Sequence, residues 1–447
     1  MFKKILIANR GEIAVRIIRA CRELGIRCVA VYSTADSNAL HARIADEAVC
    51  IGPADTKDSY LNAKALLAAC EITGCDAVHP GFGFLSENAA FAAMCRKCGV
   101  EFIGPSPESI EMLGDKATAK ETMKKAGVPV IPGSEGAVRT DEDAVKAAEE
   151  IGYPLLVKAS AGGGGRGIRI VEKPEDLLNQ IGEARTEAKN YFGDDAVYME
   201  RFVKNPRHVE IQILADKQGN VIHLGERDCS MQRRNQKVLE ESPSPVMTDA
   251  LRKKMGEAAV KAALACGYHN AGTIEFLVEG GNFYFMEMNT RIQVEHPVTE
   301  FVTGVDLVKS QIKIAAGLPL DYSQDDISVK GHSIECRINA ENPKLNFRPS
   351  PGKIEALHIP GGPGIRIDSA AYQGYTIPPY YDSMIAKLIV CAPTRKEAIM
   401  KMKWALSEFI VDGIDTNIDF QLALIKSEAF ESGEYDNRYL DTFKFDE

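Results

Sequence analysis

Two β-rich runs within residues 273–289 meet at Gly280-Gly281-Asn282, a pattern that predicts a β-hairpin. If those three residues form the loop, Glu275 and Glu287 face each other on one side of the sheet, and Asn289 lies on the same side. Like charges directly opposite one another destabilise a sheet. A Mg²⁺ ion, held by carboxylates together with substrate phosphates, would remove that conflict. The hairpin therefore predicts a metal site, with a solvated hairpin that carries scattered acids as the alternative.

The stretch Arg291–Pro297 follows the hairpin directly and adds a cation and a further carboxylate. The planar guanidinium of Arg291 suits a planar anion. Glu295 is a candidate general base if it lies within hydrogen-bond reach of that anion. A base needs a pKa nearer neutral than that of a free glutamate, and we expect burial to supply the shift. An ordinary surface glutamate is the alternative.

The composition is typical of a soluble globular protein. The chain has 447 residues, 45% hydrophobic and 26% charged, which suits roughly two to four domains. A formal net charge of −10 disfavours a nucleic acid or an anionic membrane as the main partner. No apolar run reaches the length of a membrane span, and the first residues lead into a strand rather than a signal peptide. With its 11 cysteines expected to be reduced, we expect a cytoplasmic protein.

Short apolar runs alternate with a helical stripe near the N-terminus. The runs Ile5–Ala8, Val29–Tyr32 and Ala77–His79 predict strands, and Gly11–Leu24 predicts a helix. This alternation predicts a doubly wound α/β domain. The first turn holds one glycine where a dinucleotide-binding turn holds three, so we expect no nicotinamide or flavin site.

The pattern changes from about Gly114, where Gly114-Asp-Lys116 opens a predicted helix. Residues 153–171 then run strand, glycine loop, strand, with Lys158 placed before the glycines. A P-loop has the opposite order and leads into a helix. We therefore predict a mobile flap whose backbone N–H groups cover phosphates, with Lys158 beneath it. A flexible hairpin tip is the alternative.

Four motifs resemble those of the biotin carboxylases, a family of the ATP-grasp superfamily, and the resemblance covers the chain from Lys4 to about Tyr439. The motifs are Gly81–Asn88, Asp228–Arg234, Glu287–Val298 and Glu335–Glu341. The resemblance implies an α/β fold with an N-terminal doubly wound domain over residues 1–113. It further implies an ATP-grasp domain over residues 114–329, with a lid at about 131–204, and a mixed α+β C-terminal domain over residues 330–447.

The resemblance implies that MgATP (or MnATP), bicarbonate and biotin on a separate carrier protein give carboxybiotin, ADP and phosphate through carboxyphosphate. This is the first half-reaction of a biotin-dependent carboxylase. We expect a stand-alone, homodimeric subunit of an acetyl-CoA carboxylase in fatty acid biosynthesis. Its expected partners are a biotin carboxyl carrier protein and carboxyltransferase subunits. The final acceptor of the carboxyl group is not fixed by the sequence.

The resemblance also implies a role for each matching residue. ATP would be bound by Lys116, Lys158, Gly163, Gly164, Gly165, Glu200, Val203 and His208, with the adenine at Glu200 and Val203. The metal would be held by Glu275 and Glu287, with support from Asn289. Bicarbonate would be positioned by Lys237, Arg291 and the backbone of Gln293 and Val294, and deprotonated by Glu295. Arg337 would stabilise the biotin enolate.

These roles also have physical reasons. Phosphoryl transfer depends mainly on positioning and charge stabilisation, which lysines, a metal and an arginine supply. The biotin enolate needs a preorganised cation, and Arg337 stays charged at any working pH. A structural arginine paired with Glu335 or a neighbour is the alternative. Asn235 and Phe82 depart from the residues common in the family and would tune the fit of the nucleotide or an inhibitor.

The sequence Met400-Lys401-Met402 imitates the site at which biotin is attached to carrier domains. Ile399, Leu406 and Phe409 recur with Met402 at helical spacing, so we predict a helix with Lys401 on its polar side. Two competing functions remain open: another ATP-grasp ligase, such as a carbamoyl-phosphate or amino-acid ligase, and a regulatory module that binds ATP without turnover.

Overall fold

The N-terminal part of the chain is a parallel sheet with the strand order β3-β2-β1-β4-β5. The strands are β1 (Lys4–Ile7), β2 (Arg27–Ser33), β3 (Glu47–Gly52), β4 (Ala77–His79) and β5 (Glu101–Phe102). The helices of this part are α1 (Gly11–Glu23), α2 (Leu40–Ile44), α3 (Ala63–Thr73), α4 (Ala89–Lys97) and α5 (Pro107–Gly114). Ile5 and Ile7 share a core with α1, whereas Leu6 shares one with α3 and α4. Because successive strand residues face opposite sides, both faces are covered, and the predicted doubly wound domain is confirmed.

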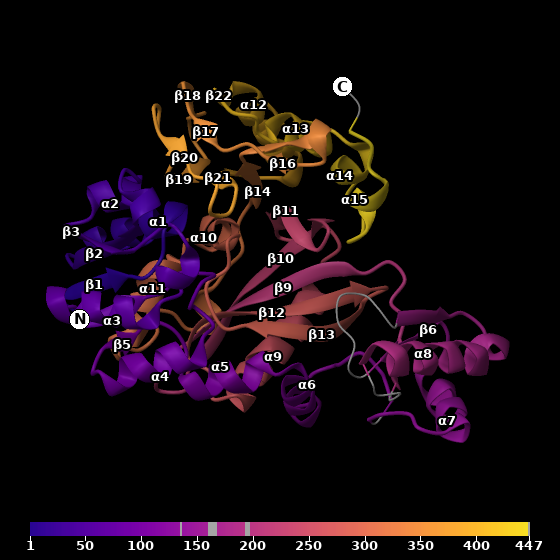
Figure 1. Ribbon diagram of the computed structural model, residues 1–447. Coiled ribbons are helices and arrows are strands. Elements are labelled where there is room, and N and C mark those ends of the chain that lie inside the picture. The colour runs from indigo at the N-terminus through magenta and orange to yellow at the C-terminus, as the bar shows by residue number, and fades with distance from the viewer. Residues whose placement is uncertain (135, 160–167, 193–196, 446–447) are drawn as a thin grey trace. The chain divides into compact units, whose positions relative to one another are not determined.

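The computed structural model describes the chain except residues 135, 160–167, 193–196 and 446–447, and Figure 1 shows its fold with most elements labelled. The described residues form two compact units. The first unit contains Met1–Val128, Arg207–Phe276 and Glu287–Glu447, and the second contains Pro129–Pro206 and Leu277–Met286.

A second, eight-stranded sheet has the order β13-β12-β9-β10-β11-β14-β21-β19. Its strands are β9 (Arg207–Ala215), β10 (Val221–Arg233), β11 (Gln236–Ser242), β12 (Asn270–Glu279), β13 (Asn282–Asn289), β14 (His332–Asn339), β19 (Ile365–Ser369) and β21 (Met384–Ala392). Helices of the same region are α6 (Lys116–Lys125), α9 (Asp249–Ala265), α10 (His296–Thr303) and α11 (Leu307–Ala315). The side chain of Asp115 caps α6 by accepting from the Thr118 N–H, as the predicted helix start requires.

The hairpin of β12 and β13 differs from its prediction by one residue in the turn. β12 ends at Glu279 and β13 begins at Asn282, so the turn is Gly280-Gly281 rather than three residues. Both glycines have positive φ, 57° and 81°. A two-residue hairpin turn with positive φ at both positions matches the twist of the flanking strands. The prediction was wrong because Asn282 is compatible with either a loop or a strand end.

The second unit is built on the antiparallel sheet β7-β6-β8. Its elements are β6 (Leu155–Ala159), β7 (Ile168–Val171), β8 (Val197–Arg201), α7 (Asp141–Ile151) and α8 (Leu177–Phe192). Apolar residues of both helices and the three strands form one core, which includes Ala148, Val157 and Ile181. The predicted strands on either side of the glycine run are confirmed. The glycine loop itself lies outside the described residues.

The C-terminal part mixes strands and helices, as predicted. Short strands are β15 (Glu341–Asn342), β16 (Arg348–Pro349), β17 (Gly352–Lys353), β18 (Ala356–His358), β20 (Thr376–Ile377) and β22 (Ile410–Asp412). The helices are α12 (Arg395–Glu408), α13 (Ile418–Ile425), α14 (Glu428–Ser432) and α15 (Tyr439–Thr442). Ile399 and Leu406 of α12 pack into one core with Ile334 of β14 and Leu388 of β21. This packing fixes β21 and its neighbour β14, which carries Arg337 of the site described next.

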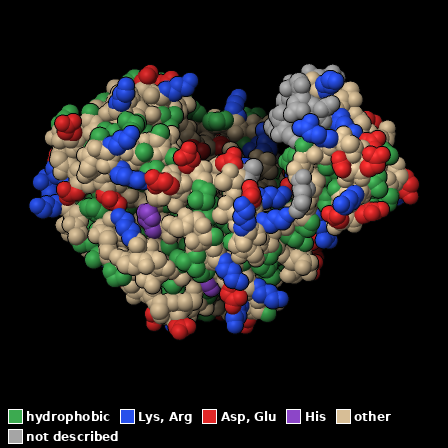
Figure 2. Space-filling model, turned by 90° about the horizontal axis from the view of Figure 1, so that it is seen from below, with side chains coloured by type: hydrophobic (Ala, Val, Ile, Leu, Met, Phe, Trp, Pro, Cys, Tyr) green, Lys and Arg blue, Asp and Glu red, His purple; other side chains and the backbone are tan. Residues whose placement is uncertain are grey.

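The described residues contain no helix that is both long and apolar enough to cross a membrane. On the face drawn in Figure 2, acidic and basic side chains are interspersed among hydrophobic ones.

Candidate active site

Glu295 stands at the start of α10 and is completely buried. Pro297 lies in the first turn of that helix, where a fixed φ is favourable and a missing N–H costs nothing. Gly304 ends the helix in the left-handed conformation, with φ 75°. Helix α10 is therefore well defined at both ends, and Glu295, the residue just before it, presents a carboxylate to the interior.

Lys237 of β11 lies at the centre of a buried group of carboxylates. Its Nζ donates to Glu210 Oε2 at 2.6 Å, to Glu295 Oε1 at 2.7 Å and to Glu275 Oε1 at 2.9 Å. An ammonium group has three donors, and all three are used here. Burial alone would lower the pKa of Lys237, but Glu210 and Glu295 raise it well above its usual value. The lysine is therefore a permanent cation that joins β9, β12 and the start of α10.

The pKa of Glu295 contradicts the expectation from the sequence. Burial raises the pKa, as we expected, but Lys237, Arg337 and Arg227 outweigh it and hold the pKa well below the usual range. The expectation was wrong because it counted burial without the cations buried beside the carboxylate. Glu295 is thus an ionised carboxylate held between two cations, with its Oε2 2.9 Å from Arg337 Nη2.

Arg337 of β14 is paired with Glu240 as well as with Glu295. Its Nε donates to Glu240 Oε1 at 2.6 Å. Burial raises the pKa of Glu240 to about 7. The alternative partner Glu335 does not accept a hydrogen bond from Arg337 or any other described residue. The arginine therefore bridges two acids at the edge of the carboxylate group, with its side chain 18% exposed.

Glu275 is held by four side chains. Asn289 Nδ2 and Gln293 Nε2 donate to its Oε1 at 2.9 and 3.1 Å, and His208 Nε2 lies 3.0 Å from its Oε2. Burial raises the pKa of Glu275, but Lys237 and His208 lower it further than burial raises it. Of the predicted metal-site residues, Glu275 and Asn289 are thus in contact, and Gln293, predicted for bicarbonate, joins them.

Glu287 lies apart from that network and contacts Lys116, with 3.4 Å between Lys116 Nζ and Glu287 Oε2. Its side chain is 42% exposed. Among the described residues, the tight groups of candidate metal ligands are His208, Glu210 and Glu275, and Glu210, Cys229 and Glu295.

Lys237 donates to acids of both groups, so its ammonium offsets part of their negative charge. Carboxylate and amide oxygens suit Mg²⁺, but Glu287 belongs to neither group, so the role of Glu275, Glu287 and Asn289 as metal ligands stays a prediction.

Arg291 is oriented by three side-chain acceptors and by the Ile292 carbonyl oxygen. Its Nε donates to Glu87 Oε2 at 2.9 Å, its Nη1 to Gln293 Oε1 at 2.8 Å and its Nη2 to Asn289 Oδ1 at 3.0 Å. No described residue accepts a hydrogen bond from the N–H groups of Gln293 and Val294. A cation and two peptide donors therefore occur within four consecutive residues, an arrangement suited to a small anion.

The described part of the second unit carries three of the predicted nucleotide residues. Lys158 of β6 donates to Glu200 Oε2 of β8 at 2.5 Å, across the pair of strands. Val203 is buried, with 8% of its surface exposed. Gly163, Gly164 and Gly165 lie outside the described residues, so their predicted role in the lid stays a prediction.

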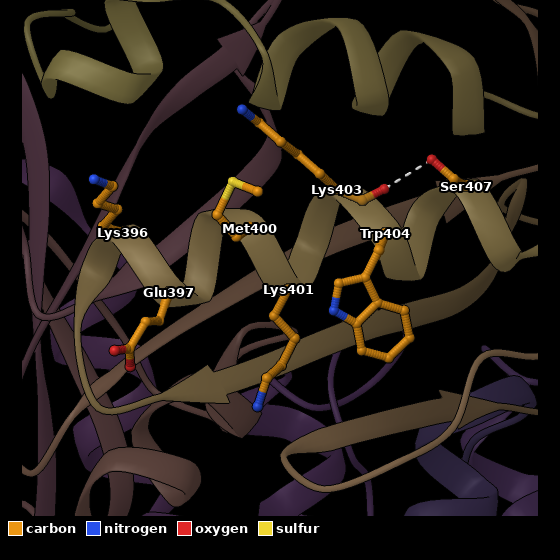
Figure 3. A pocket seen from close by; sticks show the side chains of 7 residues that line it. All are labelled: Lys396, Glu397, Met400, Lys401, Lys403, Trp404 and Ser407. Atoms are coloured by element: carbon orange, nitrogen blue, oxygen red, sulfur yellow. Dashed lines mark hydrogen bonds between the residues drawn. The ribbon is translucent and has the colours of Figure 1, made fainter.

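Lys401 lies on helix α12, as predicted (Figure 3). Ile399, Met402, Leu406 and Phe409 are all buried, so the predicted helical face is confirmed. The Lys401 ammonium donates to the carbonyl oxygens of Pro363 and Cys391, at 2.9 and 2.7 Å. A lysine fixed on a helix in this way differs from one presented on an exposed tight turn.

Sequence reasoning gave no role to several residues that shape the site. Arg227 is fully buried and donates to Glu210 Oε1 at 2.5 Å. Glu240 and Glu87 hold the two arginines described above. The sequence does contain one indication of such a pair. Arg227 and Glu210 are charged residues within strand-forming runs, and a charge at a buried strand position needs a partner.

Three family models match successive parts of the chain. They are "Biotin carboxylase, N-terminal domain" over residues 1–110, "Carbamoyl-phosphate synthase L chain, ATP binding domain" over residues 115–323, and "Biotin carboxylase C-terminal domain" over residues 335–442.

One curated relative and two solved structures extend this result. Biotin carboxylase 1 of Bacillus subtilis (strain 168) is 59% identical over 445 residues, 99% of each chain. The crystal structure of the biotin carboxylase subunit of pyruvate carboxylase has 53% sequence identity and a TM-score of 0.94, with 100% of both chains covered.

The second solved structure is the biotin carboxylase domain dimer of 2-oxoglutarate carboxylase from Hydrogenobacter thermophilus, in complex with MgADP, ADP and bicarbonate. It has 53% sequence identity and a TM-score of 0.87, with 100% of both chains covered. Matches along the whole sequence, to proteins this similar, leave one assignment: the chain belongs to the biotin carboxylase family of ATP-grasp enzymes.

Proposed function

We propose that this chain carboxylates biotin on a separate carrier protein, using ATP and bicarbonate through carboxyphosphate, and releases ADP and phosphate. The observation that carries the proposal is the buried Glu295 carboxylate between Lys237 and Arg337. The reaction needs a base for bicarbonate and a cation for the biotin enolate, and this arrangement supplies both.

Glu295 is the proposed base for bicarbonate, although its pKa is low in the arrangement described above. Two cations neutralise it, and one of them, Arg337, is the proposed partner of the biotin oxygen. When Arg337 turns to the ureido oxygen of bound biotin, Glu295 loses a cation that lowers its pKa, and its basicity rises. The base would therefore become effective only when the acceptor is bound.

Bicarbonate is proposed to lie against Arg291 and Lys237, with the N–H groups of Gln293 and Val294 as further donors. Arg291 is already oriented by Glu87, so little rotational freedom is lost when the anion binds. Donors that point to a fixed place stabilise charge that develops there. Arg337 then serves the second step, in which the biotin oxygen becomes negative.

ATP is proposed to be held by Lys116, Lys158, His208 and the glycines of the lid, with the adenine at Glu200 and Val203. Glu275 and Glu287, with support from Asn289, would hold Mg²⁺ or Mn²⁺. The bound ion would neutralise phosphate charge during transfer. Lys158 pairs with Glu200 in the second unit, so a nucleotide would compete with this carboxylate for the ammonium.

The test of this proposal is ATP cleavage by the purified chain. We expect ADP formation that requires bicarbonate and rises when biotin is added. An ATP-grasp ligase for another acceptor would respond to ammonia or an amino acid instead of biotin. A regulatory module would bind ATP and release no ADP. Either result would reject the proposal.

We further propose that the chain works in an acetyl-CoA carboxylase, as a homodimer in the cytoplasm, together with a biotin carboxyl carrier protein and carboxyltransferase subunits. The helical setting of Lys401 supports a carrier that is separate from this lysine. Carboxyl transfer from the loaded carrier should depend on acetyl-CoA. Transfer to pyruvate or 2-oxoglutarate alone would place the chain in a different carboxylase.

A further inference from the structure

One face of the large sheet carries charged residues on three neighbouring strands. The strand registers place Lys387 of β21 directly between Arg337 of β14 and Asp368 of β19. Residues directly opposite one another on neighbouring strands share a face. Lys387 is therefore the immediate neighbour of the arginine proposed to act on biotin. Two adjacent cations repel, so this arrangement requires acids or other acceptors close by.

Lys387 is completely buried and is held at three points. Its Nζ lies 3.1 Å from Glu12 Oε1 of α1 and 3.8 Å from Asp368 Oδ2 of β19. It also donates a hydrogen bond to the Val294 carbonyl oxygen at 2.8 Å. Burial alone would lower the pKa of Lys387, but Glu12, Glu335 and Asp368 raise it. The side chain is therefore a buried ammonium group.

The contact with Val294 reaches the proposed bicarbonate site. A peptide group is planar, so the Val294 carbonyl, the Glu295 N–H and the two flanking Cα atoms move together. A donor that fixes this carbonyl also fixes the position from which the Glu295 side chain begins. The Val294 N–H is itself a proposed donor to bicarbonate. The loop before α10 is thus anchored by a charge on β21.

We propose that Lys387 is a positioning residue for bicarbonate activation: its ammonium group holds the Val294–Glu295 peptide in place, and Glu12 and Asp368 hold the ammonium. This inference rests on the proposed roles of Val294 and Glu295. If Lys387 were purely structural, its loss would affect the kinetics for ATP and for bicarbonate equally. A positioning lysine affects the bicarbonate step more than nucleotide binding.

The test compares Lys387→Met with wild type in bicarbonate-dependent ATP cleavage. Lys387→Met removes a hydrogen bond from a charged donor. We expect this loss to lower kcat/KM for bicarbonate roughly 10- to 100-fold. The KM for ATP should stay within about twofold, because the contacts of Lys387 with described residues involve Glu12, Asp368 and Val294 and none of the proposed nucleotide residues. Lys387→Met leaves Glu12 buried beside a neutral chain, so the double variant Lys387→Met with Glu12→Gln removes both charges and protects folding.

Lys4→Met is the matched control. Lys4 of β1 also donates to a backbone carbonyl, that of Thr73 at 2.7 Å, and pairs with a glutamate, Glu47, at 2.8 Å. It should lower the melting temperature without raising the KM for bicarbonate. An unchanged kcat/KM for bicarbonate in the folded single or double variant would overturn the inference, as would an equal loss for ATP and bicarbonate. Failure of wild type to cleave ATP with bicarbonate would instead reject the proposed function.

Discussion

At the scale of single residues, the site is a set of buried charges that hold one another. Glu295, Lys237 and Arg337 form a chain of contacts with Glu240 and Glu210 at its ends. Removing one partner from such a set leaves another charge buried and uncompensated. Variants at these positions therefore need controls that lose similar ion pairs elsewhere.

Arg337→Ala should separate the two parts of the reaction. Its cation is needed once biotin becomes negative, so carboxybiotin formation should fall by about 100-fold or more, while slow bicarbonate-dependent ATP cleavage remains. Arg252→Ala is the control, because Arg252 likewise bridges two carboxylates, those of Glu226 and Asp249. Equal loss of both activities in Arg337→Ala would identify a structural arginine.

Glu275→Gln and Glu287→Gln should each lose activity at ordinary Mg²⁺ concentrations and regain part of it with excess Mg²⁺ or Mn²⁺. An amide oxygen is a weaker ligand than a carboxylate, so more metal is needed to fill the site. Glu279→Gln is a control on the same hairpin, since Glu279 accepts from the Lys204 and Asn205 N–H groups. If metal dependence is unchanged in both site variants, the hairpin does not hold the ion.

His41 of α2 should make stability depend on pH. Burial lowers the pKa of this histidine to about 4, so between that value and its unfolded value only the unfolded chain binds the proton. The contribution of His41 to the free energy of unfolding is complete above the unfolded pKa of about 6.5. About 3 kcal/mol of that free energy is lost as the pH falls to about 4.

The measurement for His41 is the unfolding free energy of wild type and His41→Asn at pH 7, 5.5 and 4.5. The variant should show a shallower loss of stability on acidification. His358→Asn, at an exposed position, is the control. Parallel curves for wild type and His41→Asn would contradict the assigned shift.

At the scale of elements, helices and strands were predicted correctly where the apolar residues of a segment followed a single periodicity. The helix predicted for Gly11–Leu24 is α1, and the strand predicted for Ala77–His79 is β4. The hairpin turn was misjudged by one residue. The pKa of Glu295 could not be predicted, because Lys237 and Arg337 come from β11 and β14, and their approach depends on strand pairing across the large sheet.

The junction of β14 and β21 offers a test of element packing. Gly331, before β14, has φ +73°, and an added Cβ would lie 2.6 Å from the Ala392 carbonyl oxygen. Gly317, after α11, has φ +84° but an added Cβ would meet nothing within 4 Å. Gly317→Ala should cost about 1 kcal/mol in strain. Gly331→Ala should cost roughly 2 kcal/mol more through the clash.

Denaturant unfolding of the two alanine variants would measure this difference. Equal stabilities would mean that the backbone beside Gly331 yields without cost, and that β14 and β21 are less tightly fixed than their packing indicates.

At the scale of the whole molecule, we expect this chain to catalyse the first of the two half-reactions of a biotin-dependent carboxylase. Membership of the family explains the order, along the chain, of the N-terminal parallel sheet, the ATP-grasp part and the C-terminal part. The identity of the carrier protein depends on the surfaces of other proteins. Binding energy from a carrier can orient the ureido ring, and free biotin lacks that energy. Free biotin should therefore be a poor acceptor, with a far lower kcat/KM than a biotinylated carrier.

The most direct test follows the carbon of bicarbonate to the carrier protein. Wild-type chain, MgATP, radiolabelled bicarbonate and a purified biotinylated carrier protein are mixed, and label on the carrier is measured together with ADP. We expect labelled carboxybiotin on the carrier, with one ADP for each carboxyl group transferred, and no biotin mass on this chain's own Lys401. ATP cleavage that leaves the carrier unlabelled, or free biotin that performs as well as the carrier, would rule out carboxylation of a separate carrier.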